Sequence, residues 1–221
     1  MEIKVVRQIL EWNEDCSNEI KEELSQKDIF LINVMGSPGA GKTSIIISLI
    51  KELEDKYRCG VIEGDVAGQI DADKMAEMGI PVVQLTTEGA CHIEAMSIKH
   101  ILPHFKLEDL DVLFVENIGN LVCPAEFNIG EDYRLAVLSV PEGDDKVVKY
   151  PLLFSTTDVL AINKSDMLEH FDFDLERVIA DSKGVNPGIT IYNVSNRTKE
   201  GVCELAQKLA SEIDKKKKKQ A

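Results

Sequence analysis

The sequence predicts an α/β protein in which a mostly parallel sheet is flanked by helices on both faces. Short apolar runs alternate with segments that carry apolar residues at helical spacing, which is the pattern of repeated β-α units. A glycine-rich motif follows the first apolar run directly and leads into a helical pattern. An amphipathic segment precedes all of these, so we expect an N-terminal helix before the first strand.

The N-terminal helix is expected over residues 4–24, where apolar side chains recur at steps of three and four from Val5 to Leu24. The strands are expected near 29–34, 60–62, 82–85, 112–115, 135–140, 159–162 and 190–194. The later helices are expected near 43–53, 71–78, 92–102, 173–181 and 199–213. The acidic stretch 141–145 is expected to be an exposed loop.

A chain of 221 residues with 44% hydrophobic residues can bury one sizeable core. We expect a docking helix over 1–28, a catalytic domain over 29–214 and a solvated lysine-rich tail over 215–221. The net charge is −14, from 25 Lys and Arg against 39 Asp and Glu. Such a charge opposes binding to phosphate backbones and anionic lipid, so neither nucleic acid nor membrane is an expected partner.

The cysteines point to a reducing compartment. The five of them form no closely spaced pair and no even set, so a disulfide framework is not expected. The N-terminal segment is charged, and no long apolar stretch follows it, which argues against a secretory signal or a membrane span. The sequence therefore predicts a cytoplasmic protein.

A phosphate-binding loop of the form G-x-x-x-x-G-K-[ST] follows the first predicted strand. Its residues are Gly36, Ser37, Pro38, Gly39, Ala40, Gly41, Lys42 and Thr43, and Ser44 is expected to complete the contact with the nucleotide. Backbone N–H groups of such a loop surround phosphate oxygens, the lysine reaches the β- and γ-phosphates, and the Thr hydroxyl binds Mg²⁺. The motif predicts a P-loop NTPase.

A second motif predicts that the base is guanine. Asn163, Lys164 and Asp166 directly follow the strand expected at 159–162. An ionised Asp166 can accept from both N1–H and N2–H of guanine, whereas adenine offers no donor at N1. Ser195 and Asn196 follow the last strand and are expected to complete the base pocket, although a simple turn is an equal alternative.

Magnesium should be held by Thr43 and by carboxylates, because Mg²⁺ prefers oxygen ligands. Glu116 ends a strand, and Asp65 and Asp71 follow another, where turn and helix-capping roles are the alternatives. Gly119 is expected to offer its N–H to the γ-phosphate, which completes the expected catalytic set of Lys42, Thr43, Asp71, Glu116 and Gly119. Hydrolysis is expected to be slow, because no residue clearly supplies an added cation; Lys146 and Lys149 could act across a dimer, with a solvated charge as the alternative.

Cys91, His92 and Cys123 suggest a metal site. Two thiolates and an imidazole suit Zn²⁺ or Ni²⁺, and a fourth ligand could be water or come from an identical subunit. Packing of the cysteines as small apolar groups is the alternative. Cys123 lies four residues beyond Gly119, in the segment that a γ-phosphate should order, so nucleotide state and metal affinity should be coupled.

The motifs together resemble the HypB family of hydrogenase nickel-incorporation accessory GTPases, with the stretch from Glu116 to Pro124 the most specific part. The resemblance covers residues 29–213 and implies a homodimer formed on GTP binding, with Cys91, His92 and Cys123 as metal ligands at its interface. It also implies partners: other nickel-maturation proteins and the hydrogenase large-subunit precursor. The first 28 residues hold only Cys16 and no His-rich tract, so an autonomous nickel store of the kind many members carry is not expected.

Three alternatives stay open from the sequence. A urease-type nickel accessory GTPase shares the phosphate loop but arranges Cys and His differently. A nucleotide-gated metal scaffold would hydrolyse GTP only incidentally. A small-molecule kinase could use the same loop, but the guanine motif argues against it.

Overall fold

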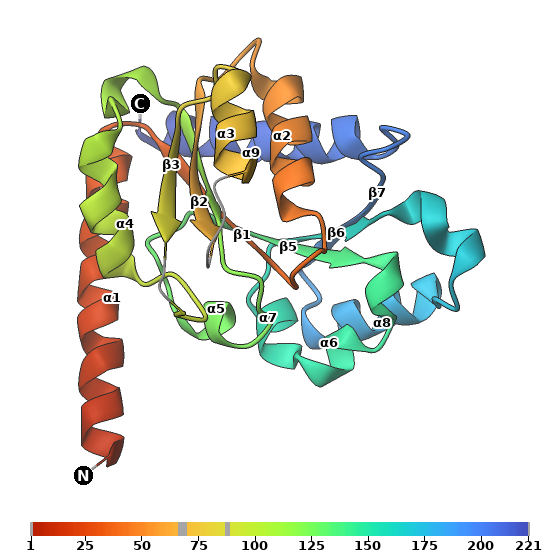
Figure 1. The fold of residues 1–221 in the computed structure, drawn as a ribbon. Coiled ribbons are helices and arrows are strands. Elements are labelled where there is room, and N and C mark those ends of the chain that lie inside the picture. Colours follow the sequence, from red (N-terminus) through yellow and green to blue (C-terminus); the bar gives the residue numbers. More distant parts are fainter. Residues whose placement is uncertain (1, 66–69, 87–88, 221) are drawn as a thin grey trace.

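The computed structural model describes residues 2–65, 70–86 and 89–220, and over these it forms a seven-stranded sheet with helices on both faces (Figure 1). The strand order is β3-β2-β4-β1-β5-β6-β7, and every strand pair is parallel. The predicted fold class is therefore confirmed.

The strands lie on the predicted apolar runs. They are β1 (Phe30–Gly36), β2 (Cys59–Asp65), β3 (Val82–Thr86), β4 (Val112–Glu116), β5 (Tyr133–Ser139), β6 (Val159–Asn163) and β7 (Thr190–Val194). β1, β4 and β6 are buried at every residue. Helices cover both faces of a parallel sheet, so its central strands are continuously apolar rather than alternating.

The helices expected from the sequence are present, and over the described residues three short α-helices and four 3₁₀ helices are additional. The α-helices are α1 (Glu2–Gln26), α2 (Lys42–Leu53), α3 (Ile70–Glu77), α4 (Ala95–Ile101), α5 (Cys123–Glu126), α6 (Lys146–Lys149), α7 (Pro151–Ser155), α8 (Leu175–Val185) and α9 (Val202–Gln220). The 3₁₀ helices are η1 (Leu102–His104), η2 (Leu107–Asp109), η3 (Val140–Glu142) and η4 (Ser165–His170). Over the described residues, none of them combines the length and apolar character that a bilayer-spanning segment requires.

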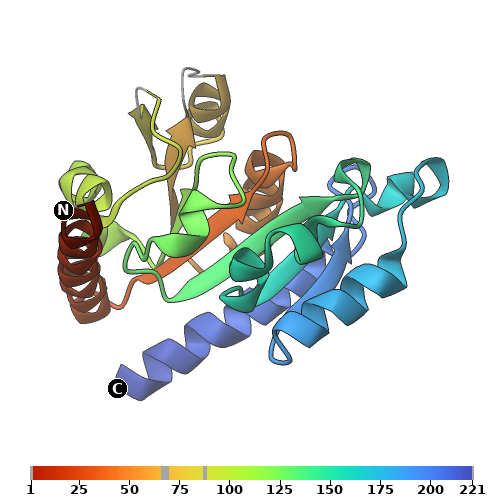
Figure 2. The same ribbon diagram turned by 90° about the horizontal axis from the view of Figure 1, so that it is seen from below.

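The helices divide between the two faces of the sheet (Figures 1 and 2). One face packs against α2, α3 and α9 in a continuous apolar cluster. The opposite face has two clusters, one with α1 and α4 over β1, β2 and β4, and one with α5 to α8 over β5 and β6. This arrangement leaves the carboxyl ends of the strands accessible, which is where open α/β sheets bind ligands.

The lysine run at the C-terminus differs from the expected solvated tail. Helix α9 continues to Gln220, and two of its lysines reach carboxylates at the amino-terminal edge of the sheet. Lys216 Nζ lies 2.6 Å from Asp132 Oδ2 and donates to the Ile29 carbonyl at 2.8 Å. Lys217 Nζ lies 2.8 Å from Asp111 Oδ1. The ion pairs hold this end of α9 against the body of the protein.

Asp111 makes the largest set of these contacts, and it yields a pH-dependent prediction. Its Oδ2 accepts from the Arg58 backbone N–H and from Arg58 Nε, each at 2.9 Å. Burial by itself raises the pKa of Asp111, but the hydrogen bonds from Arg58 and Lys217 outweigh it and leave that pKa well below its usual range.

We predict that Asp111→Asn lowers the free energy of unfolding by about 1 kcal/mol at pH 7. The folded-state pKa is depressed, so the stabilisation is complete above the unfolded-state pKa of about 4 and is lost as pH falls through the folded-state pKa. Urea unfolding at pH 7 and pH 3 should therefore give a smaller difference at pH 3. Asp109→Asn is the matched control, since Asp109 is 68% exposed and lies 3.8 Å from the same Arg58. An equal difference at both pH values would contradict this assignment.

Candidate functional site

The glycine-rich loop joins β1 to α2 at the carboxyl edge of the sheet. Gly39 and Gly41 have φ of 77° and 95°, so the loop needs glycine to turn there. Lys42, 7% exposed, lies under the loop, with Nζ 3.4 Å from the Gly36 carbonyl oxygen and 3.3 Å from that of Ser37. The N–H groups of the first turn of α2 follow directly, so the loop can bind phosphate as the motif predicts.

The second motif packs directly on this loop. Asn163 Nδ2 donates to the Ala40 carbonyl at 2.7 Å, and Lys164 Nζ donates to the Gly39 carbonyl at 2.8 Å. A Cβ at Gly41 would lie 2.4 Å from Asn163 Nδ2, so glycine is required by the close approach as well. Beside this junction is a cavity of about 300 Å³, lined by Gly41, Ser44, Asn163, Lys164, Asp166, Met167, His170, Asn196 and Arg197.

Asp166 faces this cavity as a carboxylate held in position. Ser195 Oγ donates to Asp166 Oδ1 at 2.7 Å, and this bond lowers the pKa of Asp166 despite the opposing effect of burial. Ser195 is completely buried, so it orients Asp166 from behind rather than lining the cavity. Asn196 lines the cavity and donates to Asn163 Oδ1 at 3.2 Å. An ionised, oriented carboxylate is what hydrogen bonding to two guanine N–H groups requires.

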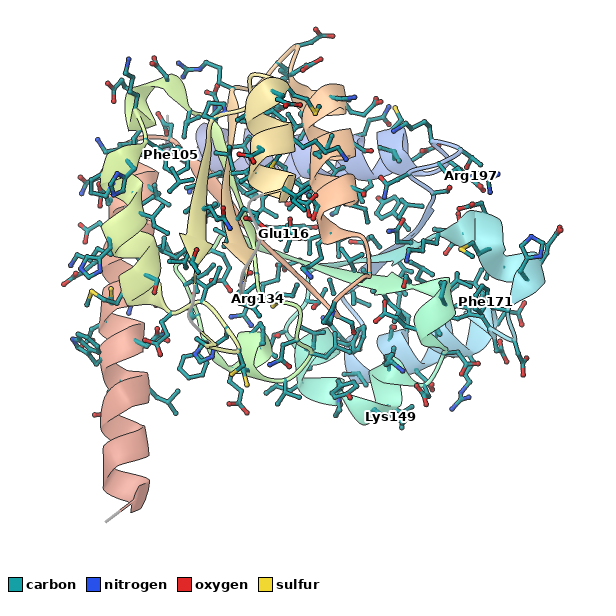
Figure 3. All side chains as sticks on the ribbon, viewed as in Figure 1. Phe105, Glu116, Arg134, Lys149, Phe171 and Arg197 are labelled. Atoms are coloured by element: carbon teal, nitrogen blue, oxygen red, sulfur yellow. The ribbon has the colours of Figure 1, made fainter. Side chains whose placement is uncertain are left out.

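Arg197 is a cavity residue that the sequence did not single out. Its Nη1 lies 3.5 Å from Asp166 Oδ2, and its side chain is 85% exposed. It lies just beyond β7, the strand at one edge of the sheet (Figure 3). It directly follows Ser195 and Asn196, which were predicted, but a lone arginine in a turn carries no pattern of its own. Met167 and His170 were missed for the same reason.

Three of the predicted magnesium ligands lie together beside the phosphate loop. Thr43 Oγ1 donates to Glu116 Oε1 at 2.9 Å and lies 3.4 Å from Asp71 Oδ2. Glu116 is 7% exposed at the end of β4, and Asp71 lies in the first turn of α3 rather than at its cap. The set contains only oxygen donors, which fits Mg²⁺. The side chain of Asp65, the other predicted carboxylate, lies outside the described residues.

The segment that follows Glu116 rests on the phosphate loop. A Cβ at Gly119 would lie 2.7 to 2.9 Å from atoms of Pro38, so only glycine permits this contact. The next residue, Asn120, forms an antiparallel bridge with Gly36. A change in the conformation of the phosphate loop would therefore act on this segment through direct contact.

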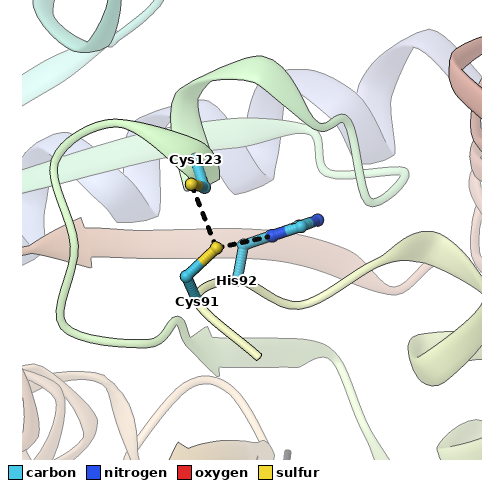
Figure 4. A group of neighbouring side chains, drawn as sticks. All are labelled: Cys91, His92 and Cys123. Carbon is cyan, nitrogen blue, oxygen red and sulfur yellow. Dashed lines mark hydrogen bonds between the residues drawn. The ribbon is translucent and has the colours of Figure 1, made fainter. Parts of the chain in front are cut away.

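Cys91, His92 and Cys123 also lie together, as predicted (Figure 4). Cys91 Sγ is 3.0 Å from Cys123 Sγ and 3.5 Å from His92 Nδ1, and the three ligand atoms lie within 4.8 Å of one another. Cys123 begins α5, whereas Cys91 and His92 precede α4, which starts only at Ala95. Two sulfurs and one nitrogen at this spacing could hold one Zn²⁺ or Ni²⁺ with a position open.

The imidazole is fixed by its surroundings. The ring of His92 stacks on that of Phe127, with centroids 3.9 Å apart and an interplanar angle of 26°. On its other side, Nε2 lies 3.8 Å from Glu94 Oε1. At this distance the two groups attract each other electrostatically when His92 is protonated, but they form no hydrogen bond, so the stacking on Phe127 is the contact that orients the ring. Neither Phe127 nor Glu94 was expected from the sequence, because neither belongs to a recognisable ligand pattern.

The protonation of the cluster favours the thiol and the neutral imidazole. Burial lowers the pKa of His92, and the hydrogen bond with Cys123 raises the pKa of Cys91. Metal binding to thiols releases protons, so affinity at this cluster should weaken as pH falls.

Two asparagines connect this cluster to the segment beside the phosphate loop. Asn117, 1% exposed, accepts from the Ile93 N–H at 3.2 Å through its Oδ1. Asn120 Nδ2 donates to the Cys91 carbonyl at 3.1 Å. Both asparagines lie in the segment that begins at Glu116, whose side chain accepts from Thr43. The structure thus joins the phosphate loop and the thiol–imidazole cluster through a single stretch of backbone.

Lys146 and Lys149, considered as cations that act across a dimer, lie on the short helix α6 (Figure 3 labels Lys149). Both form ion pairs with Asp145, that of Lys146 at 3.0 Å. Asp145 is thus the carboxylate with which both lysines pair among the described residues.

Comparison with known proteins agrees with this geometry. A family profile described as "CobW/HypB/UreG, nucleotide-binding domain" matches residues 30–193. "Hydrogenase maturation factor HypB" of Rhizobium leguminosarum bv. viciae is 40% identical over 200 residues, covering 90% of this chain and 67% of that protein. "Hydrogenase/urease maturation factor HypB" of Helicobacter pylori is 40% identical over 200 residues, covering 89% of this chain and 82% of that protein.

A solved structure is similar in fold as well as sequence. The crystal structure of HypB from Helicobacter pylori in complex with nickel superposes with a TM-score of 0.87 at 35% identity, over 92% of this chain and 95% of that one. The profile, the relatives and this structure together show that the chain belongs to the CobW/HypB/UreG family and, within it, to the HypB hydrogenase maturation factors.

Proposed function

We propose that this protein is a GTP-hydrolysing metallochaperone that delivers nickel during [NiFe] hydrogenase maturation. One observation carries the proposal: the segment 116–120 contacts the phosphate loop on one side and, on the other, the backbone of Cys91 and Ile93, which flank His92. A residue set for nucleotide binding and a residue set for metal binding therefore share one structural element. The nickel in the crystal of the Helicobacter pylori relative supports this cargo.

The nucleotide half of the proposal assigns roles to the grouped residues. Lys42 would move from the loop carbonyls to the β- and γ-phosphates, and the Gly119 N–H would contact the γ-phosphate. Thr43, Asp71 and Glu116 would hold Mg²⁺, which neutralises charge on the transferred phosphoryl group. Asp166, oriented by Ser195, would select guanine, while the stem of Lys164 would cover the ring.

The metal half assigns Cys91, His92 and Cys123 as ligands for Ni²⁺, with Zn²⁺ as the competing ion. Of the two thiols, that of Cys91 is exposed and that of Cys123 is partly buried. We propose that GTP binding pairs two subunits through this region, so that a second copy supplies what each site lacks. Loss of the γ-phosphate would move the segment 116–123 and release the metal.

Membership of the family supports a proposal for the wider cellular role. We propose a cytoplasmic protein that receives nickel from, or hands it to, other maturation proteins and the hydrogenase large-subunit precursor. Residues 1–28 would dock such a partner, and 29–214 would form the GTPase domain. Intrinsic hydrolysis is expected to be slow, because Lys146 and Lys149, the candidates for an added cation, each form an ion pair with Asp145 of their own subunit.

A second client has one observation in its favour. The Helicobacter pylori relative is named a hydrogenase/urease maturation factor. Delivery of nickel for urease maturation is therefore the alternative that we keep. It would use the same segment, 116–123, and the same cluster of Cys91, His92 and Cys123.

Sedimentation equilibrium tests the proposal as a whole. The protein would be measured with GDP and with a non-hydrolysable GTP analogue, each with and without Ni²⁺. We expect a monomer with GDP and a dimer with the analogue, with the dimer strengthened by Ni²⁺. A single unchanged species in all four conditions would oppose nucleotide-dependent pairing.

Asp166→Asn should shift base preference from guanine to xanthine. The new amide donates a hydrogen bond where xanthine presents a carbonyl, and it no longer accepts from both guanine N–H groups. We expect GDP affinity to fall at least about 100-fold, with a gain for xanthosine diphosphate. Competition against a fluorescent nucleotide measures both. Glu169→Gln, an exposed carboxylate on the same short helix, should leave the preference unaltered. Retained GTP selectivity in Asp166→Asn would remove the base assignment.

Cys123→Ala should weaken Ni²⁺ binding while leaving GTP affinity nearly intact. Removing a direct ligand should cost more than the roughly 10–100-fold that loss of an outer partner costs. Competition with a chromophoric chelator measures the affinity, and Cys203→Ala is the control, since Cys203 is exposed on α9. Equal Ni²⁺ affinity in Cys123→Ala and wild type would exclude Cys123 as a ligand.

A further inference from the structure

Asn13 on the N-terminal helix is a buried polar residue with two long-range partners. It is 7% exposed, and its Oδ1 accepts from the Ala95 N–H at 3.0 Å. Its Nδ2 donates to the Asn128 carbonyl at 2.7 Å. One partner is a donor and the other an acceptor, so together they fix the orientation of the amide. Neither partner lies on α1.

The two partners lie next to the two halves of the thiol–imidazole cluster. Ala95 begins α4, three residues after His92. Asn128 directly follows Phe127, whose ring stacks on His92, and comes shortly after α5, which carries Cys123 at its start. The single amide of Asn13 therefore links the chain segment that holds Cys91 and His92 to the segment that holds Cys123.

The packing around Asn13 leaves little freedom to either segment. Gly130, with φ of 87°, lies against α1 so closely that a Cβ would be 2.7 Å from the Ser17 carbonyl oxygen and 2.9 Å from Ile20 Cγ2. Ile129 and Ile93 are buried in the same apolar cluster as Ile20. Helix α1, which lies beside α4 (Figure 1), thus forms a common surface for both segments.

We propose that Asn13 is a positioning residue for the metal cluster. Through its two hydrogen bonds, α1 holds the segment of Cys91 and His92 and the segment of Cys123 in position relative to each other. The inference rests on the proposed function, because it supposes that Cys91, His92 and Cys123 bind metal. The inference extends the proposed function in one respect. Helix α1 sets the distance between the two ligand segments, so that displacement of α1 changes metal affinity by acting on these segments directly.

The test is a Ni²⁺ titration against a chromophoric chelator, with GDP bound throughout, on wild type, Cys123→Ala, Asn13→Ala and Ser17→Ala. Ser17 is the matched control, because it is buried on α1 and its hydroxyl donates to the Glu14 carbonyl of the same helix. We expect Asn13→Ala to lose about tenfold in affinity, a cost typical of groups that orient metal ligands. The thiolate-to-nickel absorption band should also change shape. Ser17→Ala should match wild type.

The possible outcomes separate the inference from the proposed function. If wild type binds no Ni²⁺, or Cys123→Ala binds as wild type does, the proposed metal site fails. If both behave as proposed and Asn13→Ala keeps wild-type affinity and spectrum, the positioning role of Asn13 is wrong. A loss in Ser17→Ala equal to that in Asn13→Ala would also overturn it, since general weakening of α1 would then suffice.

Asn13→Asp covers the case in which Asn13→Ala does not fold. The aspartate keeps an acceptor for the Ala95 N–H but has no amide donor for the Asn128 carbonyl. We expect the Cys123 side of the cluster to loosen and Ni²⁺ affinity to fall below that of Ser17→Ala. Wild-type affinity in a folded Asn13→Asp protein would contradict the proposal.

Discussion

The hydrogen bond from the Ile93 N–H to Asn117 Oδ1 is the contact on which the organisation of this site depends. Asn117 follows Glu116, whose carboxylate accepts from Thr43 of the phosphate loop, and Ile93 follows His92. The amide is almost fully buried, and its Nδ2 donates to Asn33 Oδ1 inside the sheet at 3.1 Å. A buried amide without these partners would be destabilising, because water could not replace the lost hydrogen bonds. The two segments are therefore expected to move together.

This constraint explains why two chemistries share one edge of the sheet. Parallel strands end at the same edge, so β1 delivers the phosphate loop, β4 delivers Glu116, and β6 delivers the residues beside the base cavity. The thiol–imidazole cluster of Cys91, His92 and Cys123 is connected to this edge through Asn117 and Asn120, which follow β4. If the proposed GTP switch acts on the segment 116–123, linkage requires that bound metal alter nucleotide affinity to the same degree.

Local patterns made the strands, the phosphate loop and the guanine motif predictable, because each is a contiguous signal with a defined place in a β-α unit. Helices α5, α6 and α7 have only four or five residues, too few to show helical periodicity. The lysine run was misjudged because Asp111 and Asp132, which hold it, are 106 and 84 residues away in the chain. The two contacts of Asn13 span 82 and 115 residues, and the stacking of Phe127 on His92 is also a contact between residues far apart in the sequence.

The central claim is that the γ-phosphate and the metal act on one element. The most direct test is the dissociation constant of Ni²⁺ for the wild-type protein, determined by chelator competition in the GDP state and again with a non-hydrolysable GTP analogue. A coupling of the usual size would make the two constants differ by about 5-fold or more. Equal constants in the two nucleotide states, with Ni²⁺ shown to bind at Cys91, His92 and Cys123, would contradict the account.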